Sequence, residues 1–478
     1  MEETKTLFES KLRTPMQMSG AESVVHSLIA EKVTTLFGYP GGAIMPVYDE
    51  LFKYDNKLKH ILCRHEQGAI HAAQGFARVK NGVGVVLATS GPGATNLLTG
   101  ITDAQIDSTA LVCITGQVDS KLLGSDAFQE TDIISASTPL TKWNFQITRA
   151  SEIPSIMARA FYIAKSGRPG PVLIDITKDA QFELAQFHYK PCTALDGFVP
   201  YPKIEMQNIR AAAERINSAK RPLVVWGQGI LLGNAESEFK AFVDKSGIPS
   251  ASTIMGASAL PTAHPLNMGM LGMHGNYAPN VLTNECDVLI ALGMRFDDRV
   301  TGNLESYAKD ATVIHFEIDS AELNKNVIAD IPVLGNVKES LHKILPLIQE
   351  KEYPAWYKRF ADKKSIEFKE IINYDLNPSK EELTMAEVLE TINKATGQEA
   401  IIVSDVGQHQ MVSCRYGSYK NSRSHITSGG LGTMGFSLPS AIGAKLGSPQ
   451  REVVAVIGDG GFQMTLQELG TIFNIGLP

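Results

Sequence analysis

The feature that most constrains this fold is a carboxylate and a glycine-rich turn, each of which follows a short apolar run. Residues 59–63 form one apolar run, and Glu66 then falls at the start of a helical run over residues 67–79. A second apolar run, residues 83–88, leads into the glycine-rich residues 90–96. Open α/β sheets keep their sites beyond the strand ends, so we expect both features at one sheet edge. The alternative is a surface glutamate that favours a helix N-terminus through the dipole.

Strands and helices alternate along the rest of the chain in the same way, which predicts α/β domains with parallel, doubly wound sheets. A chain of 478 residues is too long for one core and fits two or three domains. We expect connectors at residues 181–203, which are irregular, and within residues 339–382, which read as surface helix. The expected strands are residues 34–38, 59–63, 83–88, 110–115, 171–176, 222–226, 288–292, 312–318, 399–404 and 453–457. The domains are therefore expected at residues 15–185, 204–345 and 383–478.

Composition excludes several classes of function. The net charge of −7 and the absence of a basic block argue against a nucleic-acid or acidic-membrane partner. The five cysteines are scattered without a CxxC pair, as expected for reduced thiols in a cytoplasmic protein. No apolar run is long enough to span a bilayer, and residues 1–14 have neither the apolar core of a signal peptide nor the composition of a transit peptide.

A second carboxylate, Asp459, ends the apolar residues 453–457 and stands among Gly458, Gly460 and Gly461. We expect a helix to start near Thr465. This arrangement suits a hard cation that bridges Asp459 to a phosphate whose oxygens accept from backbone N–H groups. An ordinary strand-to-helix turn with an aspartate cap is the alternative.

Taken in order, these motifs resemble those of the thiamine-diphosphate enzymes, and more closely those of the acetolactate synthase (acetohydroxyacid synthase) catalytic-subunit family. The resemblance runs from about Ser19 to the last residue. The motifs that carry it are Gly38–Ala43, Arg64–Ala69, Thr89–Asn96, Ala127–Glu130, Gly167–Val172, Leu271–Gly275, Arg295–Gly302, Gly430–Gly435 and Gly458–Gly460.

The resemblance implies an α/β fold of three doubly wound parallel-sheet domains, of which the third is incomplete. They are a thiamine-diphosphate pyrimidine-binding domain at residues 15–185, a central FAD-binding domain at 204–345 and a diphosphate-binding domain at 383–478. The family has a second, asparagine metal ligand farther downstream, which this sequence does not contain. We therefore expect a C-terminally truncated chain, which ends 18 residues after Gly460.

The resemblance also implies the catalytic groups. Glu66 hydrogen-bonds the aminopyrimidine of the cofactor and favours its imino tautomer, which removes the proton from the thiazolium ring. Gly41 and Gln129 lie near the reacting carbon, where a backbone amide and a side-chain amide can stabilise an oxyanion.

Three cofactors are implied: thiamine diphosphate, Mg²⁺ and FAD. The metal ligand is Asp459. Met434 supports the bent cofactor, although from its residue type alone a packing role is the simpler interpretation. The turn after residues 222–226 resembles dinucleotide-binding turns, but its spacing departs from GxGxxG. The cofactor-binding residues implied are Pro40, Glu66, Gly407, Gln408, His409, Gly432, Met434, Gly458, Asp459, Gly460 and Gly461 for thiamine diphosphate, and Arg168, Gly227, Gln228, Gly229, His274, Gly275, Arg295, Glu317 and Asp319 for FAD.

The resemblance implies four residues that select or admit the substrate: Phe128, Lys178, Met273 and Arg295. A guanidinium suits a ketoacid carboxylate because it can pair with both oxygens. For Arg295 the alternative is a structural ion pair with a neighbouring aspartate.

The implied activity is that of a transferase. The family decarboxylates pyruvate and condenses the hydroxyethyl unit with a second 2-ketoacid, pyruvate or 2-ketobutyrate, in isoleucine and valine biosynthesis. A homodimer or higher oligomer is implied, because two chains build each site, and a small regulatory subunit is the expected partner. The alternatives are another thiamine-diphosphate enzyme, either a pyruvate oxidase or a carboligase, and an inactive truncated fragment.

Overall fold

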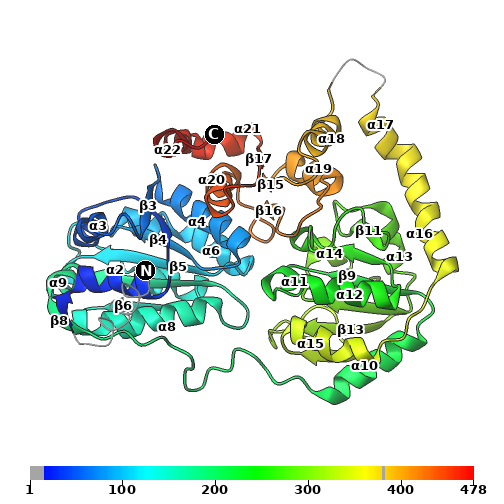
Figure 1. Ribbon diagram of the computed structural model, residues 1–478, viewed down its shortest axis with the longest axis horizontal. Coiled ribbons are helices and arrows are strands. Elements are labelled where there is room, and N and C mark those ends of the chain that lie inside the picture. Colours follow the sequence, from blue (N-terminus) through cyan, green and yellow to red (C-terminus); the bar gives the residue numbers. More distant parts are fainter. Residues whose placement is uncertain (1–15, 379–382) are drawn as a thin grey trace, which may run out of the picture. The chain divides into compact units, whose positions relative to one another are not determined.

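The computed structural model describes residues 16–378 and 383–478, and internal contacts divide them into two compact units (Figure 1). The first unit contains the described residues up to Phe198 together with Gly430–Ser448 and Asp459–Pro478. The second unit contains Val199–Gly429 and Pro449–Gly458, apart from residues 379–382. The residues predicted to form the third domain are thus shared between the two units.

The first unit is built on a six-stranded, fully parallel sheet with the order β3-β2-β4-β5-β7-β6. From β2 the chain runs outward to β3 and then returns to the other side of β2 for β4. This reversal makes the carboxyl ends of β2 and β4 the topological switch point, where open α/β sheets bind ligands. The strands are β2 (Thr35–Gly38), β3 (Lys59–Leu62), β4 (Gly84–Ala88), β5 (Leu111–Gln117), β6 (Trp143–Ile147) and β7 (Pro171–Thr177).

Helices cover both faces of this sheet, so its inner strands are apolar on both sides. Val85 packs in a core with helices α2 (Gly20–Ala30) and α8 (Ile153–Lys165). The next residue, Val86, packs in a second core with α4 (Glu66–Lys80) and α6 (Leu98–Ile106). All five residues of β4 are buried. The other helices of this part are α3 (Met45–Phe52), α5 (Pro92–Thr95), α7 (Ile133–Ser137) and α9 (Lys178–Phe182).

The second unit contains a six-stranded parallel sheet with the order β11-β10-β9-β12-β13-β14. Numbered within the sheet, this is the 3-2-1-4-5-6 order of dinucleotide-binding folds, with its switch point between β9 and β12. The strands are β9 (Pro222–Trp226), β10 (Ser250–Ser252), β11 (Asn267–Met270), β12 (Val288–Leu292), β13 (Thr312–Glu317) and β14 (Ile331–Leu334). The helices are α10 (Met206–Ser218), α11 (Gly229–Leu232), α12 (Glu236–Ser246), α13 (Tyr277–Thr283), α14 (Asp298–Thr301) and α15 (Val337–Ile344).

A third parallel sheet, β16-β15-β17, also belongs to the second unit. The helices that follow its strands in sequence, α20 (Ser437–Gly447), α21 (Asp459–Thr465) and α22 (Leu469–Ile475), belong to the first unit. The strands are β15 (Ile401–Ser404), β16 (His425–Thr427) and β17 (Val453–Val456). The remaining helices are α16 (Pro354–Glu367), α17 (Asn373–Leu376), α18 (Met385–Ala395) and α19 (Gln408–Tyr416), with a π-helical turn at Phe368–Ile372 and 3₁₀ turns at Ser120–Leu122, Thr138–Leu140, Ala150–Glu152, Ile254–Gly256, Leu345–Leu347 and Leu466–Glu468.

Two local predictions are wrong. The supposedly irregular residues 181–203 include the end of α9 and strand β8 (Leu184–Phe187), which pairs antiparallel with β1 (Met16–Ser19). No local pattern predicts that pairing, because the partner strand lies far back in the sequence. The helix expected near Thr465 instead begins at Asp459 and ends at Thr465, so its glycines are helical rather than a preceding turn.

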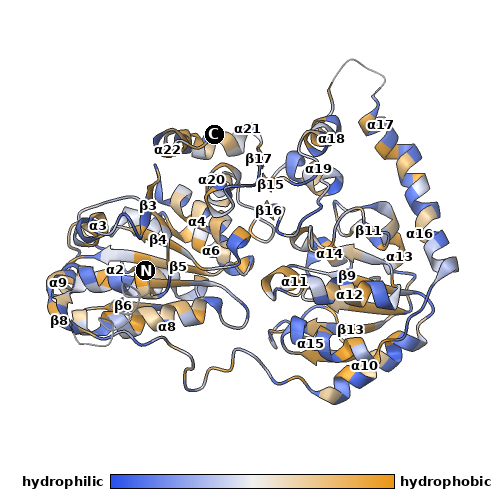
Figure 2. Cartoon of the chain, viewed as in Figure 1, coloured by the Kyte–Doolittle hydropathy of each residue, from blue (hydrophilic) through white to orange (hydrophobic). Residues whose placement is uncertain are grey.

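Strand β6 escaped prediction because it mixes polar and apolar residues and lies at a sheet edge, where its first four residues are only half-buried. Figure 2 shows the contrast between the hydrophobic strands of the large sheets and α16, on which hydrophilic and hydrophobic residues alternate. Among the described residues, no helix has both the length and the apolar character needed to cross a membrane.

Candidate active site

Glu66 is the first residue of α4, which follows β3, and its side chain reaches the switch point beside Gly93 and Asn96, which follow β4. The preceding His65 caps the helix, because its Nδ1 accepts the Gln67 N–H at 3.0 Å. The Glu66 side chain is buried, and its Oε2 accepts a hydrogen bond from Asn96 Nδ2 at 3.0 Å. The predicted position at a strand end and a helix start is therefore confirmed. The neutral Asn96 side chain orients the Glu66 carboxylate.

The glycine-rich turn after β4 reaches the same carboxylate. A Cβ atom at Gly93 would lie 3.2 Å from Glu66 Oε1 and 2.7 Å from Thr89 Cγ2, so a side chain there would crowd Oε1. A Cβ atom at Gly41 would lie 2.5 Å from the Thr89 side chain. Both glycines thus permit close packing beside the carboxylate. Pro40, just before Gly41, is half-buried at the end of β2.

Gln129 is brought to this turn by its backbone. Its φ is +59°, and a Cβ atom at Gly91 would lie 2.8 Å from the Gln129 carbonyl oxygen. The neighbouring Glu130 carboxylate accepts the Ala127 N–H at 3.0 Å and stabilises the loop. Phe128 is exposed to 86%, an unusual position for a large aromatic side chain. The structure therefore brings Gln129 together with the Gly91–Gly93 turn and leaves Phe128 free of the core.

Met434 lies in a loop whose two ends are tied to different helices. Its side chain is exposed to 39%, and a Cβ atom at Gly460 would lie 2.9 Å from Met434 Cε. Gly432 has a φ of +76°, which favours glycine there. Asp459 is exposed at the start of α21, and Gly461 behind it is buried. Met434 and Gly460 are thus neighbours, as the packing alternative and the cofactor interpretation both require.

Gly407, Gln408 and His409 form the start of α19, in the second unit. The helix N-terminus supplies backbone N–H groups suited to phosphate oxygens. His409 Nε2 lies 2.5 Å from Oδ1 of the buried Asp405, which fixes the imidazole ring. A Cβ atom at Gly458 would lie 2.8 Å from the His409 ring, so Gly458 is brought together with this group.

The glycines at the switch point of the second sheet pack against backbone. A Cβ atom at Gly227 would lie 2.5 Å from the Gly293 carbonyl oxygen, and one at Gly229 would lie 2.6 Å from Gly293 Cα. Gln228 between them is half-buried at the start of α11. Close packing of the two turns therefore explains why both positions are glycine. The backbones of both turns lie at the carboxyl ends of β9 and β12.

The other residues predicted around FAD lie in the second unit, except Arg168. Glu317 is buried, and its Oε1 accepts the N–H groups of Ile318 and Asp319 at 2.8 and 3.0 Å. His274 and Gly275 follow β11, and burial together with the Arg299 charge lowers the His274 pKa. Arg168 lies in the first unit, where its Nε donates to Ser108 Oγ at 2.9 Å.

The predicted substrate residues are also divided between the units. Lys178 begins α9 in the first unit, which also contains Phe128. Met273 and Arg295 lie in the second unit. Arg295 is 4.0 Å from the Asp297 carboxylate, so the structural ion pair stands as a real alternative to substrate binding. Met273 is exposed, and its N–H donates to the Arg299 carbonyl oxygen at 2.7 Å.

The residues present fit thiamine diphosphate and a cation at two points. Glu66 offers a buried, oriented carboxylate beside a turn that cannot carry a side chain at Gly93. Asp459 offers a single exposed carboxylate. Within the residues that the structure describes, no three His, Cys, Asp or Glu side chains form a metal cluster. Mg²⁺ takes one or two carboxylates together with substrate phosphates, so one carboxylate is compatible with it.

One residue of this site was not predicted. Glu468 is fully buried, and both of its carboxylate oxygens accept the Arg64 N–H, at 3.0 and 3.2 Å. Burial raises its pKa. The carboxylate therefore ties the C-terminal segment to the chain just before Glu66. The sequence could not predict this contact, because Glu468 lies 404 residues from Arg64.

Comparisons with known families agree along the chain. Residues 18–136 match the thiamine pyrophosphate enzyme N-terminal TPP binding domain, and residues 209–344 match the thiamine pyrophosphate enzyme central domain. Residues 405–478 match the thiamine pyrophosphate enzyme C-terminal TPP binding domain. All three matches come in the order expected from the motifs.

Three curated relatives illustrate the similarity. The acetolactate synthase of Mycobacterium leprae is 46% identical over 97% of this chain and 75% of its own length. The probable acetolactate synthase large subunit of Methanocaldococcus jannaschii is 44% identical over 96% and 79%. The acetolactate synthase large subunit of Lactococcus lactis is 43% identical over 98% and 80%.

Proposed function

Because this chain belongs to the acetolactate synthase large-subunit family of thiamine pyrophosphate enzymes, we propose that it decarboxylates pyruvate and transfers the resulting two-carbon unit to a second 2-ketoacid. The second acceptor is pyruvate or 2-ketobutyrate. The observation that carries the proposal is the buried Glu66 carboxylate at the switch point of the first sheet, beside a turn that is free of side chains at Gly93.

Bound thiamine diphosphate supplies the carbon nucleophile of this chemistry. Glu66 would hydrogen-bond the pyrimidine ring of the cofactor, and Asn96 keeps the Glu66 carboxylate oriented. The Gly41 backbone N–H and the Gln129 side-chain amide are the proposed donors to the oxygen that gains negative charge. The fixed backbone of Gln129 against Gly91 supports this role.

The diphosphate and its cation are proposed to bind to residues that follow β17 and β15. Asp459 is the proposed Mg²⁺ ligand, and the N–H groups of Gly460 and Gly461 are proposed donors to phosphate. In the second unit, Gly458 and the start of α19, with Gly407, Gln408 and His409, are further proposed diphosphate-binding residues, and the His409–Asp405 pair orients the imidazole. The positive φ of Gly432 permits the loop conformation, and Met434 would supply an apolar contact to the cofactor.

We propose FAD for the second sheet, whose strand order is that of dinucleotide-binding folds. The turn at Gly227, Gln228 and Gly229 would approach its phosphates. The residues of the second unit proposed to hold the rest of the flavin nucleotide are His274, Gly275, Arg295, Glu317 and Asp319. Arg168, in the first unit, is a further proposed FAD-binding residue. The flavin has no redox step in the proposed reaction, so its role is structural.

In the second unit, Arg295 is proposed to bind the carboxylate of the acceptor ketoacid, and Met273 is a further proposed substrate residue. In the first unit, Phe128 and Lys178 are the proposed substrate residues. Phe128 and Met273 are both exposed large apolar side chains, which supports a place at a binding surface. A homodimer or higher oligomer and a small regulatory subunit are the proposed partners, in the cytoplasm. The name "large subunit" of two relatives supports the small partner.

The test is product formation by the natural protein. Purified protein with thiamine diphosphate, Mg²⁺ and FAD should convert pyruvate to acetolactate and carbon dioxide. Added 2-ketobutyrate should yield 2-aceto-2-hydroxybutyrate as well. Omission of each cofactor in turn identifies which ones are needed.

Two rival outcomes are distinguishable in the same assay. Reversible bleaching of the flavin during turnover with pyruvate, without acetolactate, would identify an oxidase. Tight cofactor binding without any product from pyruvate, 2-ketobutyrate or glyoxylate would identify a non-catalytic protein. Either outcome contradicts the proposal.

A further inference from the structure

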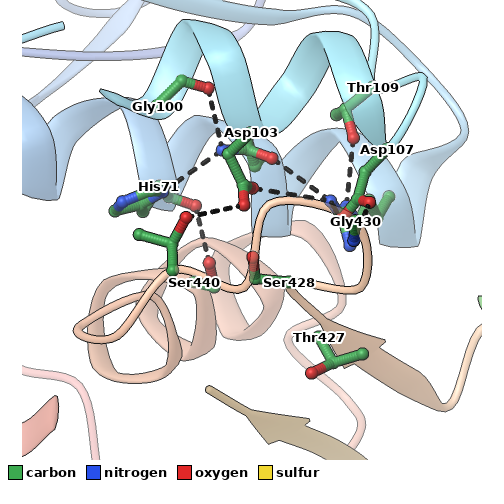
Figure 3. Close-up of polar contacts among 12 residues, drawn as sticks. His71, Gly100, Asp103, Asp107, Thr109, Thr427, Ser428, Gly430 and Ser440 are labelled. Atoms are coloured by element: carbon green, nitrogen blue, oxygen red, sulfur yellow. Dashed lines mark hydrogen bonds and ion pairs between the residues drawn. The ribbon is translucent and has the colours of Figure 1, made fainter. Parts of the chain in front are cut away.

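A buried polar cluster joins helices α4 and α6 to the loop that carries Met434 (Figure 3). Its charged members are Arg78 on α4 and two carboxylates, Asp103 and Asp107, at the end of α6. Arg78 Nη2 lies 3.0 Å from Asp107 Oδ2 and 3.9 Å from Asp103 Oδ2. The three side chains are nearly or fully buried. None of them belongs to the site described above.

The two aspartates occupy an unfavourable place. Asp107 is the C-cap of α6, and Asp103 lies in its last turn. The partial negative charge of a helix C-terminus repels carboxylates, and burial removes the water that would otherwise solvate them. One guanidinium faces both. Carboxylates retained under these conditions need strong hydrogen-bond donors nearby, and the next donors come from the loop.

The loop supplies a hydrogen-bond donor to each aspartate. The Gly430 N–H donates to Asp107 Oδ1 at 2.8 Å, and Thr433 Oγ1 donates to Asp103 Oδ1 at 2.9 Å. Figure 3 shows Gly430 beside Asp107 as the loop passes over the end of α6. A Cβ atom at Gly430 would lie 1.9 Å from Ile106 Cγ2, so the backbone there rests directly on the helix. Both contacts are charge-assisted and shielded from water.

Further contacts fix the ends of the loop. The ring of Phe436 lies 5.2 Å from the Arg78 guanidinium, and Ser440 Oγ donates to the His71 carbonyl oxygen at 2.9 Å. At the same end, Thr465 Oγ1 donates to the Gly435 carbonyl oxygen at 3.1 Å. Thr433 is therefore held inward while the next residue, Met434, stays exposed.

We propose that Asp103 and Asp107, held by Arg78, are positioning residues that fix the loop Gly430–Gly435 and thereby present Met434 to the bound cofactor. The inference rests on the proposed function for what Met434 meets, and on the contacts above for the loop itself. Neither aspartate is among the residues proposed to contact substrate. Each carboxylate is held in place by its ion pair with Arg78. It is therefore a rigid hydrogen-bond acceptor that fixes the position of the loop relative to α6.

The test uses a matched pair at the loop side of one contact. Thr433→Val keeps the shape and removes the donor, whereas Thr433→Ser keeps the hydroxyl. Hydrogen–deuterium exchange of the cofactor-free natural protein should become about ten-fold faster in residues 429–436 for Thr433→Val and stay within about two-fold for Thr433→Ser. Asp107→Asn, which weakens the acceptor of the Gly430 N–H, should have the same effect as Thr433→Val.

Cofactor affinity gives a second readout. Thr433→Val should raise the Kd for thiamine diphosphate about ten-fold, and Thr433→Ser should restore it. The double variant Thr433→Val with Asp103→Asn should raise the Kd by less than the product of the two single increases, because both substitutions affect the same hydrogen bond. Thr283→Val is the control, since it removes a buried hydroxyl that donates to the Pro279 carbonyl oxygen in the second unit.

The outcomes separate this inference from the proposed function. Unchanged exchange of residues 429–436 in Thr433→Val overturns the positioning role, whatever the cofactor does. Equal loss of affinity in Thr283→Val also overturns it, because general destabilisation then explains the effect. Wild-type protein that does not bind thiamine diphosphate overturns the proposed function, while the exchange result still decides the loop. If Asp103→Asn does not fold, the Thr433 pair reports the same contact.

Discussion

Strands β4 and β17 have the same kind of sequence and very different surroundings. Each is an apolar run followed by glycines at a predicted cofactor-binding end. All residues of β4 are buried, whereas all four residues of β17 are only half-buried. Strand β4 lies between β2 and β5, and helices pack on both sheet faces. Within the described residues, β17 pairs with β15 alone.

This difference teaches that an apolar pattern sets what a strand can bury, while its neighbours decide how much it does bury. The two carboxylates also differ in burial. Glu66 follows the edge strand β3, but its side chain lies against the turn after β4, and it is buried and oriented by Asn96. Asp459, at the edge strand, is exposed. A buried carboxylate suits a directional hydrogen bond to a ring, and an exposed one suits a hydrated cation.

The largest expected effect comes from a substitution at Glu66, which tests the role of the buried carboxylate in catalysis against a role in cofactor binding. Glu66→Gln keeps the shape and an oxygen that can accept from Asn96, but it cannot favour the same proton position on the cofactor. We expect kcat for acetolactate formation to fall about 100-fold or more, while the Kd for thiamine diphosphate changes less than about three-fold. Glu305→Gln, an exposed glutamate in the second unit, is the control. A loss of binding with kcat retained would contradict the buried-acid role.

Asp459→Asn should give the opposite pattern. Removal of the negative charge weakens a Mg²⁺ ligand, so we expect the Mg²⁺ concentration for half-maximal activity to rise roughly ten-fold or more. At saturating Mg²⁺ and thiamine diphosphate, kcat should recover most of its value. A titration of Mg²⁺ against activity measures both quantities. If kcat instead stays low at every Mg²⁺ concentration, the comparison between the two carboxylates fails.

Elements with a strong local pattern could be predicted, and contacts between distant residues could not. The starts and ends of α4, β9 and β12 follow from apolar periodicity and from a turn at each end. The hydrogen bond from the Arg64 N–H to Glu468 joins residues 404 positions apart, and the Asp103–Thr433 hydrogen bond joins residues 330 positions apart. In sequence, Asp103 reads as an ordinary helix acid. Its partner is determined by the chain path, which local propensity does not contain.

The candidate site shows the same division. The family resemblance named the residues whose backbone or carboxylate is proposed to contact a ligand, such as Gly41 and Glu66. It did not name residues that hold those groups from behind, such as Asp103, because they lie outside the motifs that bind. The sharing of residues 383–478 between two units was also not expected, because a sequence boundary carries no information on which unit a helix packs with.

A smaller effect comes from a carboxylate buried inside the finished sheet. Asp175 on β7 is fully buried and accepts hydrogen bonds from Thr115, Gln117 and Gln146. Burial raises its pKa from 3.8 to about 6, against the lowering effect of these hydrogen bonds. The folded state therefore binds a proton more tightly than the unfolded state. Its contribution to stability is full below pH 4 and is lost as the pH rises toward and through about 6.

Asp175→Asn should remove this dependence. Relative to the variant, the wild-type free energy of unfolding should fall by up to about 3 kcal/mol between pH 4 and pH 7, at about 1.4 kcal/mol per pKa unit. Urea unfolding at several pH values measures the difference. Parallel curves for the two proteins would show that Asp175 does not titrate in this range.

The smallest effect tests burial of the two strands directly, with one substitution in each. Val86→Ala removes a fully buried side chain from β4, so we expect a loss of about 2 kcal/mol from transfer and cavity terms. Val454→Ala in β17 removes a half-buried side chain, and roughly half that loss or less is expected. Because the strands belong to different units, hydrogen exchange at rising urea concentration should be followed separately for each sheet. Equal losses of unfolding free energy in the two variants would mean that β17 is as buried in solution as β4 is among its neighbouring strands and helices. The strand would then be completed by a surface from another part of the protein or from a second copy, and the exposure of Asp459 would have to be measured in that state.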